Sequence, residues 1–191
     1  MSLFEPSSSL RFSFALAACL AGCGGASAGR PAAERNLPPY AGQATALFDD
    51  RIEPSAVGLA DVAARPRMDP VLRARTQRAE VVARARVATV SVESTANGPM
   101  YRLTLDLAGG SLVRRGFDDQ RVELAVRSDS PAFGVVKWLD TRLIGRSFIG
   151  FFHRYAGASE GIDLRFHLSA DDPEVLAAVR DAATLREISG P

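Results

Sequence analysis

The chain has two histidines, His153 and His167, as its candidates for proton transfer or metal binding. His153 lies in an apolar run, residues 148–155, whereas His167 alternates with Asp163 and Arg165 on the polar face of an expected strand. A metal site or a general base would require both histidines to converge with a carboxylate such as Asp163. No spacing in the sequence indicates that convergence, and no GxSxG, HExxH or P-loop motif is present. We therefore expect no catalytic, cofactor-binding or metal-binding residue, and a hydrolase or metal-dependent enzyme using His153 or His167 stays an alternative.

A second group of chemically capable side chains is acidic. Asp49, Asp50 and Glu53 are oxygen ligands of the kind that calcium takes. The regular alternation and the glycine of a calcium-binding loop are missing from this segment. We therefore expect a solvated acidic patch beside Arg51.

The overall charge is balanced, with 23 basic and 22 acidic residues and a formal net charge of +1. Together with an apolar share of 47%, this is the composition of a globular protein and excludes binding to nucleic acid through bulk charge. All basic residues except Lys137 are arginine. We attribute that excess to a GC-rich genome rather than to phosphate recognition.

Charge is nevertheless segregated along the chain. Residues 65–86 contain seven arginines and two acidic residues, and residues 160–187 contain seven acidic residues and three arginines. One interpretation is mutual neutralisation across the fold. The other is an anionic partner, such as lipid headgroups or a cell-wall polymer, that engages the basic segment. The candidate contacts for such a partner are Arg73, Arg75, Arg78, Arg84 and Arg86.

Both cysteines, Cys19 and Cys23, lie close to the start of the chain, behind the nine-residue apolar run of residues 12–20. A nine-residue helix reaches only about 14 Å, roughly half of a bilayer's hydrocarbon core, so this run is too short for a stable membrane span. It matches the apolar core of a secretory signal peptide, with small residues where a peptidase needs room.

The residues Leu20-Ala21-Gly22-Cys23 resemble the lipobox of bacterial lipoproteins, in which an aliphatic residue and two small residues precede a cysteine. The resemblance covers residues 1–23. It implies that the Cys23 thiol receives a diacylglyceryl group, that the signal is cut between Gly22 and Cys23, and that the new amine is acylated. The residue after the cysteine is Gly24 rather than aspartate. By the sorting rule of this family, that implies the outer membrane rather than the inner one.

The domain organisation follows from these signals. Residues 1–22 are expected to be the signal peptide, and residues 23–46, rich in glycine, alanine and proline, a lipidated flexible tether. Residues 47–191 are expected to form a single β-rich globular domain. With Cys19 removed and Cys23 acylated, no thiol remains for a disulfide, so stability must come from packing.

Hydrophobic patterning predicts five strands in this domain, at residues 81–92, 101–107, 121–127, 148–155 and 162–168. The first changes its apolar face near Ala88, which predicts a one-residue bulge. The fourth is apolar on both faces, and Gly150 within it indicates a bend or a close backbone approach. Asp69-Pro70 begins a short N-terminal helix that ends near Arg78, and a C-terminal helix is expected over residues 172–188.

These elements predict a mainly β, α+β fold: a small antiparallel five-stranded OB-like barrel or sandwich with an N-terminal and a C-terminal helix. The alternative is an open antiparallel sheet with a helix on one face. Residues 130–146 are amphipathic and fit a helix that caps one end of the barrel.

The function that the sequence favours is that of a non-catalytic, membrane-anchored envelope lipoprotein, a binding or interaction module held by the lipid on Cys23. Its partner would be an envelope protein or an anionic polymer, and not nucleic acid. A further alternative is a structural subunit of an envelope complex, which would expose an apolar patch around residues 133–143.

Overall fold

The sheet is built around its longest strand, β2 (Val81–Thr95), which pairs with three other strands. The computed structural model describes residues 37–61, 65–107, 111–115, 119–157 and 161–189. All of them belong to one compact unit, residues 32–191. Along β2 the pairing with β3 (Gly98–Leu107) shifts register between Val87 and Thr89, which confirms the bulge predicted near Ala88. The extra residue lets one long strand turn its apolar side chains from one face to the other.

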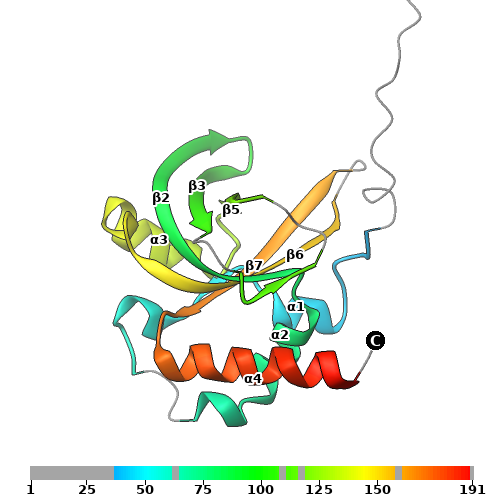
Figure 1. Ribbon diagram of the computed structural model, residues 1–191. Coiled ribbons are helices and arrows are strands. Elements are labelled where there is room, and N and C mark those ends of the chain that lie inside the picture. Colours follow the sequence, from blue (N-terminus) through cyan, green and yellow to red (C-terminus); the bar gives the residue numbers. More distant parts are fainter. Residues whose placement is uncertain (1–36, 62–64, 108–110, 116–118, 158–160, 190–191) are drawn as a thin grey trace, which may run out of the picture. The chain divides into compact units, whose positions relative to one another are not determined.

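The sheet has the order β1-β7-β6-β2-β3-β5. The short strand β4 pairs with Val81 and Val82 of β2, on the edge of β2 opposite to β6. The remaining bounds are β1 (Arg51–Ile52), β4 (Val113–Arg114), β5 (Arg121–Val126), β6 (Ser147–Ala156) and β7 (Ile162–Ala170). Neighbours are antiparallel except β1 and β7, which are parallel. The sheet curls into a half-barrel (Figure 1). Together with the helices that pack on it, it forms a mixed α+β fold.

The five long strands lie where the sequence predicts them, but the expected count of five strands is too low. β1 and β4 have two residues each and therefore carry no alternating pattern that a sequence could display. β1 matters most for the chemistry described below, because it lies at the free edge of β7.

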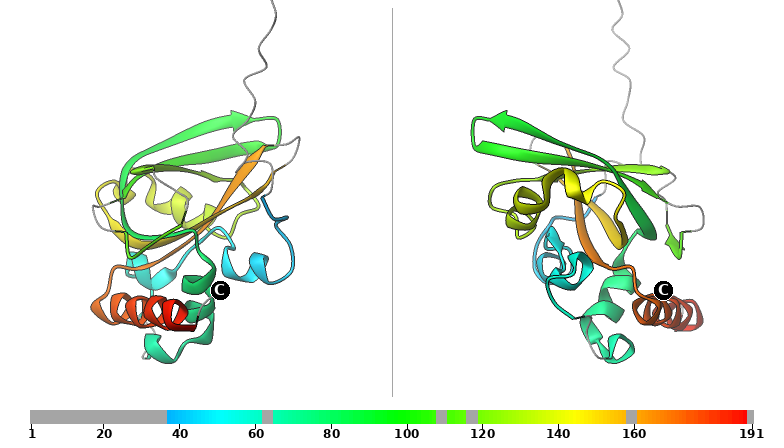
Figure 2. Two further views of the ribbon diagram at one scale, coloured as in Figure 1. Left: turned by 45° about the vertical axis from the view of Figure 1, so that its right-hand side comes forward. Right: turned by 90° about the vertical axis from the view of Figure 1, so that its left-hand side faces the viewer.

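Helices pack on both sides of the curled sheet (Figure 2). Inside the curl, α3 (Phe133–Leu139) and the 3₁₀ turn η4 (Asp140–Leu143) pack on the apolar side chains of β2, β3, β5, β6 and β7. Outside it lie α1 (Gln43–Leu47), α2 (Pro70–Arg78) and α4 (Pro173–Ser189). Two further 3₁₀ turns, η2 (Pro54–Val57) and η3 (Pro66–Met68), connect β1 to α2. None of the helices in the described part of the chain is both long and apolar enough to cross a membrane.

Both predicted helix starts are confirmed. The Asp69 carboxylate accepts a hydrogen bond from the Val71 amide at 2.8 Å, and Pro70 occupies the first helical position of α2. The Asp172 carboxylate accepts from the Glu174 amide at 2.8 Å at the start of α4. Each carboxylate satisfies an amide that the helix itself leaves unpaired.

Strand β6 is buried on both faces, as its continuous apolar run predicts. Phe148 and Phe152 face the core inside the curl, and Ile149 and Phe151 face the outer helices. Gly150 lies against the Phe152 ring, where a Cβ would come within 2.5 Å of ring carbon Cζ. This confirms the close approach that the glycine indicates.

Residues 37–46, which the sequence assigns to the flexible tether, are part of the folded domain. The predicted start of that domain at residue 47 is therefore too late. The Ala156 amide donates to the Pro38 carbonyl at 2.9 Å, and the Tyr40 hydroxyl donates to the Phe48 carbonyl at 2.6 Å. Ala44 in α1 is buried. Few large apolar residues mark this segment, and it packs because Tyr40 lies against Tyr155 at 5.1 Å between ring centroids. The signal peptide and Cys23 lie outside the described residues.

Candidate functional site

The polar face of β7 lies outside the curl, and the acidic residues near the start of the chain run along it. Alternate positions of β7 carry Asp163, Arg165, His167 and Ser169. β1 pairs with β7 in parallel, with Arg51 opposite His167. This register brings Asp49, Asp50 and Glu53 to the polar face; together with the four β7 residues they form what we term the His167 cluster.

His167 is held between two carboxylates. Its Nδ1 lies 2.8 Å from Oδ1 of Asp49, and its Nε2 lies 2.9 Å from Oε1 of Glu53. Because an ionised carboxylate only accepts hydrogen bonds, both ring nitrogens donate and the ring is an imidazolium between two anions. The Ser169 hydroxyl donates to the same Glu53 oxygen at 2.9 Å.

The carboxylates of this cluster respond to burial in different ways. Burial alone would raise the pKa of Asp49 and of Glu53, but the hydrogen bond and the charge of His167 outweigh it and hold both pKa values below their usual range. For Asp50 burial prevails and raises the pKa, although Arg165 and the Phe166 amide act against it.

Asp50 also connects three parts of the chain. Its carboxylate is bonded to the Arg165 guanidinium, and its carbonyl accepts from the Ala132 amide at 3.0 Å and from the Ser130 hydroxyl at 3.2 Å. Arg165 bonds Asp163 as well and lies 4.3 Å from the centroid of the Tyr40 ring. Asp50 is only 4% exposed, so the predicted solvated acidic patch is wrong.

The His167 cluster is closed to proton transfer, although the buried Nε of Arg165 within it has no hydrogen-bond partner in the described part of the chain. His167 is 3% exposed and has no ring nitrogen left to accept a proton, and the Ser169 hydroxyl is committed to Glu53. Nor do three or more histidine, cysteine or acidic side chains come together as a metal site within the described ranges. The arrangement stabilises the edge of the sheet by charge-assisted hydrogen bonds.

The convergence of both histidines with Asp163 does not occur. His153 and His167 lie on paired strands and on the same outer face, but the register sets His153 opposite Arg165 and His167 opposite Phe151. Asp163 is instead bonded to Arg165 and lies 3.6 Å from Arg127. The two histidines therefore belong to separate sites.

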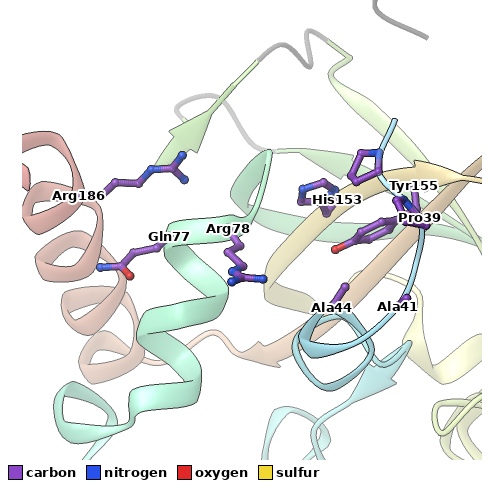
Figure 3. Close-up of a pocket in the computed structure, with 9 residues that line it drawn as sticks. Pro39, Ala41, Ala44, Gln77, Arg78, His153, Tyr155 and Arg186 are labelled. Atoms are coloured by element: carbon purple, nitrogen blue, oxygen red, sulfur yellow. The ribbon is translucent and has the colours of Figure 1, made fainter. Parts of the chain in front are cut away.

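His153 belongs to a pocket of about 540 Å³, shown in Figure 3, where α2, α4, β6 and the N-terminal segment meet. We call it the α2–α4 pocket. Its lining consists of Pro38, Pro39, Ala41, Ala44, Gln77, Arg78, His153, Tyr155 and Arg186. The lining includes two arginines and no carboxylate.

Two aromatic side chains of β6 form one wall of this pocket. The His153 and Tyr155 rings stack with centroids 4.5 Å apart and planes 19° apart. His153 Nδ1 lies 2.8 Å from the Arg154 carbonyl, which fixes the proton on Nδ1 and leaves Nε2 uncommitted. Burial, followed by the charge of Tyr40, raises the pKa of Tyr155 to about 12, so its hydroxyl stays protonated at neutral pH.

The five arginines proposed as contacts for an anionic partner have different environments. The prediction that Arg75 contacts a partner at the surface is wrong, because Arg75 is 5% exposed and its Nε donates to the Leu47 carbonyl at 2.6 Å. Arg84 pairs with Asp171 at 2.9 Å, and Arg86 donates to the Gly145 carbonyl at 3.3 Å. Arg73 is exposed on α2, and Arg78 lines the α2–α4 pocket.

The basic and acidic segments partly neutralise one another. Arg84 pairs with Asp171, and Arg67 lies 3.5 Å from Asp181. Sequence reasoning missed Arg186 as a pocket residue, because it is a minority cation within the acidic segment. Its only local signal is a basic residue in the last turn of a helix.

Residues 133–143 do not present the apolar patch that a structural subunit would need. Val136, Leu139 and Leu143 are buried inside the curl. Trp138 is 56% exposed, and the Arg142 guanidinium lies over its ring at 4.8 Å from the centroid. The apolar side chains of this segment pack inside the half-barrel, as expected for an amphipathic helix that covers one end of it.

No family model matches this chain, and neither a curated protein nor a solved structure is similar enough to count as a match.

Proposed function

We propose that this chain is a lipid-anchored protein of the bacterial cell envelope whose folded part is a non-catalytic binding module. The anchor is the diacylglyceryl group on Cys23, and the outer membrane is its destination. The support for the anchor is the lipobox-like sequence Leu20-Ala21-Gly22-Cys23 behind a short apolar run. Two or more acyl chains hold a protein durably, since each buried methylene contributes about 0.8 kcal/mol.

The observation that carries the non-catalytic part of the proposal is the closed His167 cluster. An acid–base group has to present a free lone pair or proton to a substrate. Both nitrogens of His167 and the Ser169 hydroxyl are already bonded within the cluster. The arrangement therefore supports a structural role for the titratable groups of this cluster.

The proposed form of the module is an OB-like barrel. Its support is the order of the long strands, β7-β6-β2-β3-β5, together with the proximity of β5 to β7, which are not hydrogen-bonded neighbours. Arg127, directly after β5, lies 3.6 Å from Asp163 of β7. A five-stranded, partly open barrel of this kind is a common scaffold for binding. The partner is an envelope component, a protein or an anionic polymer, and not nucleic acid.

Membrane fractionation of bacteria that express the full chain tests the anchor. The wild type is expected in the outer-membrane fraction, and Cys23→Ala is expected to lose it because the acceptor thiol is gone. Cys19→Ala is the matched control and is expected to behave as wild type, since that residue leaves with the signal peptide. Retention of Cys23→Ala in the outer membrane at wild-type levels would contradict the proposal.

A further inference from the structure

The residues that line the α2–α4 pocket carry positive charge. Arg78 and Arg186, in the last turns of α2 and α4, supply two guanidinium groups, and no carboxylate lines the pocket. The nearest acidic group to His153 is Glu80, at 4.0 Å from Nδ1, and it is paired with Arg154 at 2.7 Å. Arg115 adds further positive charge nearby: burial, and next the charge of Arg186, lower its pKa. Such a concentration of cations favours a bound anion.

The Tyr155 hydroxyl belongs to the pocket wall. The residue as a whole is 4% exposed, but its oxygen is not fully buried: the only buried side-chain nitrogen or oxygen without a hydrogen-bond partner in the described part of the chain is Arg165 Nε. No described residue forms a hydrogen bond with the Tyr155 hydroxyl, so it is available to water or to a ligand in the pocket. In Figure 3 the phenol oxygen of Tyr155 and the side chain of Arg78 are turned toward one another, with His153 beside them.

The opposite wall of the pocket is apolar. Pro38, Pro39, Ala41 and Ala44 line it, from the segment that leads into α1. A pocket of about 540 Å³ is within the range that small organic ligands occupy. The lining thus offers cationic and hydroxyl donors for a charged group and an apolar surface for the organic part attached to it.

We infer that the α2–α4 pocket binds a phosphate monoester. A monoester carries close to two negative charges and three acceptor oxygens, more than a carboxylate does, and the lining offers guanidinium and hydroxyl donors to them. Arg78 and Tyr155 lie beside one another in the pocket, and Arg186 adds positive charge from α4 (Figure 3). The ligand is either a water-soluble phosphate ester or the headgroup of a lipid at the membrane to which the module is tethered. The inference rests on the proposed function only in treating the folded part as a binding module.

Titration calorimetry on the full chain, purified in detergent, tests this inference. Glycerol 3-phosphate is the soluble probe, and glycerol is its uncharged counterpart. Mixed micelles with phosphatidic acid are the lipid probe, and micelles with phosphatidylcholine are their counterpart. Binding of either phosphate monoester, without binding of its counterpart, supports the inference, and the stronger of the two probes identifies the source of the ligand.

Substitutions place the binding at this pocket. Arg78→Gln is expected to weaken the binding about 10-fold or more, as for a lost charge-assisted hydrogen bond, and Tyr155→Phe about fivefold. Arg180→Gln is the matched control, an exposed arginine on α4 that does not line the pocket, and is expected to leave the affinity unchanged. Tyr155→Phe keeps the ring, so its effect stands even where a charge change disturbs folding.

Two results would overturn the inference: no heat of binding with either phosphate monoester, or binding that Arg78→Gln and Tyr155→Phe leave at wild-type strength. A failure of the membrane anchor would appear in cell fractionation and would leave these titrations unchanged. The two proposals therefore fail separately.

Discussion

His167 Nε2 lies 2.9 Å from Oε1 of Glu53, a residue 114 positions earlier in the chain. The contact joins strand β7 to the segment that continues from the edge strand β1 into η2. Together with the bond to Asp49, it makes the imidazole the centre of the polar face of β7.

Replacing His167 by leucine is expected to lower the free energy of unfolding by about 2–3 kcal/mol, because two carboxylates lose their charge-assisted donor. Urea unfolding at pH 7, followed by far-UV circular dichroism, measures the change. His153→Leu is the control, and its loss is expected to be smaller because that ring has a single hydrogen bond, to a carbonyl. Equal losses in the two variants would contradict the role of the cluster.

Acid is expected to destabilise the protein through Asp49 and Glu53. Their folded-state pKa values lie below the ordinary values of 3.8 and 4.5, so the unfolded chain binds protons that the folded chain does not. Their contribution to stability is fully present above about pH 5 and is lost as the pH falls through the folded-state values. The raised pKa of Asp50 acts with the opposite sign, since its contribution is lost as the pH rises through the folded-state value.

Urea midpoints between pH 7 and pH 3 measure this dependence. Glu53→Gln removes one of the two groups of the His167 cluster with a lowered pKa, so its midpoint should fall less steeply with acid than that of the wild type. Glu187→Gln provides a surface comparison, because Glu187 is exposed near the end of α4. A Glu53→Gln curve parallel to that of the wild type would speak against the assigned sign.

The acidic segment shows where sequence reasoning stops. Asp49, Asp50 and Glu53 form a local pattern that is typical of a solvated loop. The register of β1 against β7 brings them to the sheet, where Asp50 is buried and Asp49 and Glu53 are half-buried. A two-residue strand has no periodicity from which that pairing could be predicted. The partners His167 and Arg165 are more than a hundred residues away.

Features with a local physical cause were predictable. The change of apolar face in β2 gave the bulge between Val87 and Thr89, and the proline-led starts of α2 and α4 gave both helices. The α2–α4 pocket was not predictable, because its lining comes from four separate segments. Arg78 and Arg186 lie in segments of opposite charge balance, and only the packing of α2 on α4 brings them to one pocket.

Arg75 is a buried arginine, and we expect its substitution to affect the stability of the fold. Arg75→Met is expected to lower the free energy of unfolding by about 2 kcal/mol, because the Leu47 carbonyl loses its charged donor. Arg73→Met, two residues earlier and exposed, is expected to change stability by less than about 0.5 kcal/mol. Thermal unfolding of the two variants under one set of conditions makes the comparison. A larger loss for Arg73→Met would contradict the burial of Arg75.

Gly150→Ala is expected to destabilise the protein by about 1–3 kcal/mol, because the new methyl group would lie 2.5 Å from the Phe152 ring in a packed core. Gly134→Ala is the matched control in α3, where no atom lies within 4 Å of the added Cβ. That change is expected to be neutral or to stabilise by up to about 1 kcal/mol through helix propensity. Differential scanning calorimetry of both variants tests the pair, and a stable Gly150→Ala would show that β6 has room at this point.

The anchor on Cys23 is the central claim, and the intact mass of the mature protein, isolated from its native membrane, tests it most directly. We expect a chain that begins at Cys23 and carries a diacylglyceryl group on the thiol, with further acylation at the new amine. A mass that still includes residues 1–22, or one without acyl chains, would contradict it.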